Sequence, residues 1–71
     1  MNEGQKHTIA RMEKILEGLK EEQSIIRKRI HIVFNDGKKE VASALGFADA
    51  AMTSQIIEAK QRLDDFVKAS Q

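Results

Sequence analysis

Apolar residues recur at alternating steps of three and four over the first half of the chain. The positions are Ile9, Met12, Leu16, Leu19, Gln23, Ile26, Ile30 and Val33. Seven of these eight side chains are apolar, and this spacing is typical of one face of an amphipathic or coiled-coil helix. We therefore predict a helix over residues 5–34, capped by Asn2 or Thr8 and stopped by the turn signal Asn35-Asp36-Gly37.

The two halves of this predicted helix differ. The first half has one narrow apolar face, whereas residues 25–34 carry apolar side chains around most of the circumference, so the second half should contact neighbours on several sides. Gln23 interrupts the apolar face between the halves, and it either fixes register or partner number or is simply a solvated edge. A β-strand over residues 30–34 is an alternative, because β-branched residues are frequent there.

Helical spacing returns after the turn. The apolar positions are Val41, Ala42, Leu45, Met52, Ile56, Ala59, Leu63 and Phe66. A continuous helix would put Asp49 on the apolar face and Gly46 in a helix interior, where glycine costs about 1 kcal/mol relative to alanine. A break removes both problems, because Gly46 then ends a short helix over residues 38–45 and Asp49 caps a second helix over 49–69. The predicted fold class is all-α, and the alternative is a simple two-helix hairpin that forms a bundle.

Residues 38–57 resemble the helix-turn-helix of phage Cro and repressor proteins. The small residue of that pattern is Ala42, the turn is Leu45-Gly46-Phe47, and Met52 and Ile56 are the hydrophobic residues of the second helix. The resemblance implies a trihelical core over residues 25–69 and a homodimeric transcriptional regulator that binds double-stranded DNA. Residues 5–24 would then form a dimerising coiled-coil stripe through Ile9, Met12, Leu16, Leu19 and Gln23.

The charge distribution changes this expectation only in detail. Twelve basic and eleven acidic residues give a net charge of +1, which is no signature of nucleic-acid binding by itself. No Arg or Lys lies between Lys39 and Lys60, so base contacts would come from Ala50, Thr53 and Ser54. The phosphate contacts would come from the basic residues around the preceding turn, which are Arg27, Lys28, Arg29, Lys38 and Lys39. A solvated charged surface is the alternative reading of that group.

Composition indicates a single small helical domain, residues 1–71, that is cytoplasmic and has no membrane partner. The chain has no Cys and no Pro. His7 and His31 lie far apart, and no catalytic or metal-ligand set exists, so we expect neither an enzyme nor a cofactor. A second hypothesis is therefore a helical hairpin that binds itself or a helical protein partner, as an adaptor, chaperone or inhibitor without DNA binding.

Overall fold

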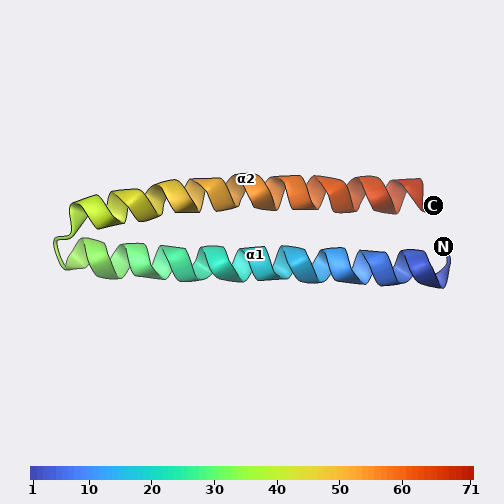
Figure 1. Ribbon diagram of the computed structural model, residues 1–71, viewed down its shortest axis with the longest axis horizontal. Coiled ribbons are helices and arrows are strands. Elements are labelled where there is room, and N and C mark those ends of the chain that lie inside the picture. Colours follow the sequence, from blue (N-terminus) through green and yellow to red (C-terminus); the bar gives the residue numbers. More distant parts are fainter.

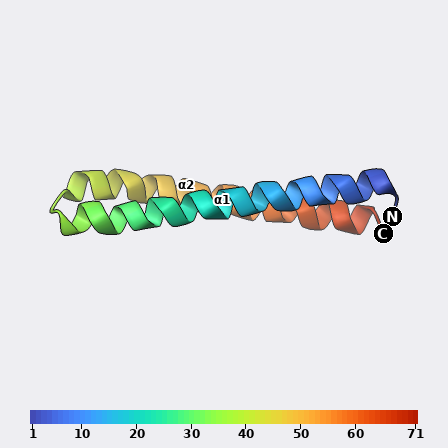
Figure 2. The same cartoon turned by 90° about the horizontal axis from the view of Figure 1, so that it is seen from below.

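The computed structural model describes all 71 residues, Met1–Gln71, as two long helices joined by a short turn. Helix α1 spans Glu3–Asn35 and helix α2 spans Lys39–Ala69. The helices run antiparallel along their whole length, so both termini lie at one end (Figure 1), and they cross at a shallow angle in the perpendicular view (Figure 2). The predicted all-α class is confirmed, in the form of the two-helix hairpin. Residues 30–34 are helical and form no strand.

Local hydrogen bonds fix both ends of α1. The Oδ1 atom of Asn2 accepts a hydrogen bond from the Gln5 backbone N–H at 2.8 Å, and the Asn2 N–H donates to Gln5 Oε1 at 2.9 Å, which together form a capping box. At the other end, Gly37 has φ +78°, and the Lys38 N–H donates to the Val33 carbonyl at 2.9 Å. The predicted cap Asn2 and the stop at residues 35–37 are therefore confirmed.

The break predicted between residues 45 and 49 is absent, because α2 continues unbroken through Gly46 and Asp49. The only positive φ in the chain belongs to Gly37. A break would cost backbone hydrogen bonds of the helix interior, and Asp49 needs no capping role because it finds partners on α1. The short helix over 38–45, the trihelical core over 25–69 and the helix-turn-helix over 38–57 are therefore not the arrangement of the structure.

The two apolar faces meet along the hairpin. All eight positions of the predicted α1 face are half-buried, from Ile9 to Val33. The facing positions of α2 have the same alternating steps of three and four and are Ala42, Leu45, Asp49, Met52, Ile56, Ala59, Leu63 and Phe66. The residues predicted to form an interface between two chains, Ile9, Met12, Leu16, Leu19 and Gln23, lie on the α1 face that contacts α2 within the chain, because the short turn folds α2 back onto this face.

The hairpin leaves an unusually large surface exposed. Ala42 is its only buried residue, and the molecule measures 53 × 15 × 10 Å. Its accessible surface is 5574 Å², whereas a compact chain of 8.0 kDa exposes about 4,500 Å². The radius of gyration is 16.2 Å, against about 11 Å for a compact domain of this length. Two helices alone do not enclose a core.

Candidate helix-docking surface

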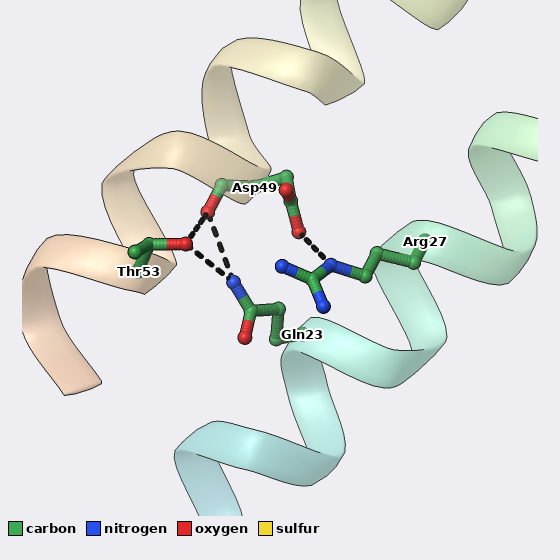
Figure 3. A network of polar contacts seen from close by, with 4 residues as sticks. All are labelled: Gln23, Arg27, Asp49 and Thr53. Atoms are coloured by element: carbon green, nitrogen blue, oxygen red, sulfur yellow. Dashed lines mark hydrogen bonds and ion pairs between the residues drawn. The ribbon is translucent and has the colours of Figure 1, made fainter.

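A polar layer of Gln23, Arg27, Asp49 and Thr53 joins the two helices (Figure 3), in the half of the hairpin nearer the turn. The Gln23 Nε2 atom donates to Thr53 Oγ1 at 2.7 Å and to the Asp49 carbonyl at 3.3 Å. The Thr53 hydroxyl donates to the same carbonyl at 3.2 Å, and Arg27 Nε donates to Asp49 Oδ1 at 2.9 Å. The polar residue that interrupts the α1 face therefore contacts the polar residue that interrupts the α2 face.

The hydrogen bonds of this layer favour one register of the two helices over the others. If α2 slid along α1 by one heptad, Gln23 and Asp49 would each face an apolar layer and lose the hydrogen bonds between them. Its direct contribution to stability is small, because the Arg27 side chain is 59% exposed and ion pairs open to solvent are worth at most about 1 kcal/mol. Of the two alternatives for Gln23, the structure thus favours a residue that fixes the register of the helices over a residue that is merely solvated.

Large apolar side chains remain exposed on the outside of both helices. Phe47 is 77% exposed and Ile57 63%. The other exposed large apolar residues are Met1, Ile15, Ile25, Ile32, Phe34 and Val41. Scattered surface leucines or isoleucines are ordinary, but a row of them on an elongated molecule indicates a contact surface.

One such row lies on α1. Gly18, Ile25 and Ile32 are seven residues apart, so they share one side of the helix, which we call the outer stripe. At about 100° per residue it lies roughly 130° around α1 from the face that contacts α2. All three residues are exposed, and a Cβ atom added at Gly18 would meet nothing within 4 Å.

Charged pairs border the outer stripe on both sides. Glu21 and Lys28 lie about 50° to one side of Ile25, and Glu22 and Arg29 lie about 50° to the other. All four are exposed. The ion pairs of the hairpin are Lys6 with Glu3 and Arg27 with Asp49, so none of these four side chains is paired within the chain.

The part of α2 beside the turn carries almost no charge on its surface. Asp49 is the single charged residue from Val41 to Ile57, and it faces α1.

One groove between the helices shows which residues share a side of the hairpin. It is lined by Met12 and Ile15 of α1 and by Ala59 and Arg62 of α2. Residues seven positions from Ile15 or Arg62 stay on the same side of their helix. Glu22 and Arg29 therefore lie on the same side of the hairpin as Val41, Ala48 and Gln55. Small and uncharged residues of α2 thus adjoin the outer stripe.

The structure disperses the residues predicted to contact DNA. Arg27 is paired with Asp49, and Thr53 belongs to the polar layer. Ala50 and Ser54 are exposed on α2, about 18 Å and 24 Å along the helix from Lys38. The cations Lys28, Arg29, Lys38 and Lys39 are all exposed near the turn. No projecting recognition helix brings the two groups together, because the helix that holds Ala50 and Ser54 packs lengthwise against α1.

Other kinds of site have little support. The chain has no group of three His, Cys, Asp or Glu side chains placed to hold a metal ion. Neither helix has an apolar stretch of the length needed to cross a lipid bilayer. The outer stripe and its charged borders were missed in sequence analysis, although the spacing of Gly18, Ile25 and Ile32 by seven was a readable signal.

Comparison of this chain with protein families, with curated proteins and with solved structures gave no match.

Proposed function

We propose that this protein is a helix-assembly module, a hairpin that carries part of a helical bundle and completes the bundle with helices of another chain, its own copies included. The observation that carries this proposal is the unfinished core, in which one residue of 71 is buried while Phe47, Ile57 and Ile32 stay more than 60% exposed. Antiparallel helices with short loops are the units from which bundles are built.

The exposed area supports the same proposal quantitatively. The hairpin exposes about 1,100 Å² more than a compact chain of its mass. A standard protein interface buries about 800 Å² per partner, so the surplus is enough for one stable interface. The helices supply that interface without rearrangement, since the polar layer already fixes how they lie against each other.

DNA binding rested on the predicted bend at Gly46, and the unbroken α2 leaves it without that basis. The exposed cations near the turn are the remaining argument for it. A mobility-shift titration with mixed duplex fragments at low salt tests this directly, because phosphate-driven binding is strongest there.

Thermal unfolding at increasing protein concentration tests the assembly proposal. If association completes the core, the unfolding temperature Tm rises with concentration, because a partner that binds only the folded chain stabilises it by mass action. Light scattering on the same samples should give a molar mass above that of one chain. A protein that stays monomeric from micromolar to millimolar concentration with a constant Tm would contradict the proposal.

A further inference from the structure

We propose that the outer stripe of α1 is the docking site for the α1 helix of a second copy, antiparallel to the first, with a two-fold axis at Ile25. This inference rests on the proposed assembly function and adds the partner, the face and the orientation. A two-fold interface must be self-complementary, so that each residue on one side of the axis fits the residue at the same distance on the other side.

The shape of the stripe meets this requirement. Gly18 lies seven residues before Ile25 and Ile32 lies seven residues after it. In the antiparallel pair, Ile32 of each copy lies over Gly18 of the other, where no side chain occupies the space. The two Ile25 side chains meet at the axis. A large residue thus faces the smallest one on each side, which lets the two backbones approach closely.

The charges meet the same requirement. Glu21 and Glu22 precede Ile25 by four and three residues, and Lys28 and Arg29 follow it by three and four. A two-fold axis perpendicular to both helices keeps each border of the stripe on its own side. Glu21 then faces Lys28 of the second copy on one border, and Glu22 faces Arg29 on the other. The symmetry doubles each contact, giving four ion pairs between the chains.

The charges also disfavour the parallel alternative. In a parallel pair with the same stripe in contact, Glu21 would face Glu22 of the partner, and Lys28 would face its Arg29. Juxtaposed like charges disfavour a partner or an orientation. The antiparallel arrangement is the one in which every charge bordering the stripe meets an opposite charge.

Helix α2 does not oppose this docking. The polar layer sets Asp49 beside Gln23, so Ala48 lies at the level of the axis. On the side of the hairpin that carries the stripe, the α2 residues closest in height to the two-fold axis are Val41, Ala44, Ala48, Ala51 and Gln55. They are small or uncharged, so the second hairpin approaches without burying a charge from α2.

Charge reversal separates this arrangement from other modes of assembly. The variant Glu21→Lys with Glu22→Lys makes all four border positions basic, and Lys28→Glu with Arg29→Glu makes all four acidic. We expect each variant alone to associate at least tenfold more weakly than the wild type. An equimolar mixture of the two should form a heterodimer, because every border contact then joins opposite charges. These residues are all good helix formers, and circular dichroism checks that the helices remain.

Two further chains complete the design. Exchanging all four charges in one chain, by Glu21→Lys, Glu22→Lys, Lys28→Glu and Arg29→Glu together, keeps the net charge and should restore the homodimer. Glu13→Lys with Glu17→Lys changes the charge of α1 by the same amount outside the stripe and its four border positions, and it should associate like the wild type. A wild-type dimer that both charge-reversal variants leave intact, or a mixture no tighter than its components, would overturn this inference and leave the assembly function standing. A monomeric wild type would overturn both.

Discussion

The double variant Gln23→Leu with Asp49→Leu raises the free energy of unfolding by about 2 kcal/mol. Both side chains occupy positions where the two helical faces meet, and replacing a partly buried polar or ionic pair by well-packed apolar residues is often stabilising by 1 to 4 kcal/mol. Arg27 loses its partner at little cost, because its side chain is 59% exposed. Chemical unfolding followed by circular dichroism measures the change.

The same double variant should adopt more than one register of the two helices, although its free energy of unfolding rises. With leucines at both positions, a shift of register no longer costs the hydrogen bonds of the polar layer, so we expect a broader distribution of molar mass. The matched control is Gln61→Leu with Asp65→Leu, a glutamine and an aspartate joined by a 2.9 Å hydrogen bond on the exposed side of α2. That control should change the free energy of unfolding by less than about 0.5 kcal/mol. Loss of stability in the double variant at residues 23 and 49 would mean that the layer holds the hairpin together.

Gly46→Ala raises the free energy of unfolding by about 1 kcal/mol, because Gly46 lies inside α2 and glycine is a poorer helix former than alanine. The added Cβ meets nothing within 4 Å, so no packing loss offsets the gain. Thermal unfolding should show a Tm higher by about 5 °C.

Gly37→Ala is the comparison, since the φ of +78° at Gly37 strains any residue with a side chain. It should lower the free energy of unfolding by about 1 kcal/mol. If Gly46→Ala destabilised the protein as Gly37→Ala does, the backbone would turn sharply at residue 46, and the hairpin would be wrong.

The alternation of three and four was sufficient to predict the helical class and the inner face of α1, because that spacing depends only on helix geometry. The ends of α1 were also within reach, since Asn2 and Gly37 act through their immediate neighbours. These features are local, and local features can be inferred from one sequence.

The path of α2 was harder because it depends on a contact between distant residues. Taken alone, Asp49 is a polar residue on an otherwise apolar face. In the structure it lies beside Gln23, whose side chain donates a hydrogen bond to the Asp49 carbonyl. The two lie at similar distances from the turn, fourteen residues before Gly37 and twelve after it, so a hairpin matches the two polar interruptions. Considering them together favours one continuous helix, whereas considering Asp49 alone suggested a cap.

The outer stripe was also hard to predict, because its proposed contacts are with residues of another chain. The isoleucines of residues 25–34 were expected to have neighbours on several sides, but the structure supplies one neighbour, α2. Ile25 and Ile32 stay 48% and 61% exposed. Within one chain both side chains stay largely outside the packed face, and the equal spacing of Gly18 and Ile32 about Ile25 is what points to a second copy.

The central claim, that two hairpins join antiparallel about Ile25, is tested most directly by distances between spin labels on single cysteines. The chain has no native Cys, so Glu17→Cys, Ser24→Cys and His31→Cys each place one label per chain on the same exposed side of α1. Because each residue of offset from the axis adds about 3 Å of separation along the helix, we predict axial separations of about 24, 3 and 18 Å. Equal distances at the three positions, or no coupling between labels, would contradict the claim.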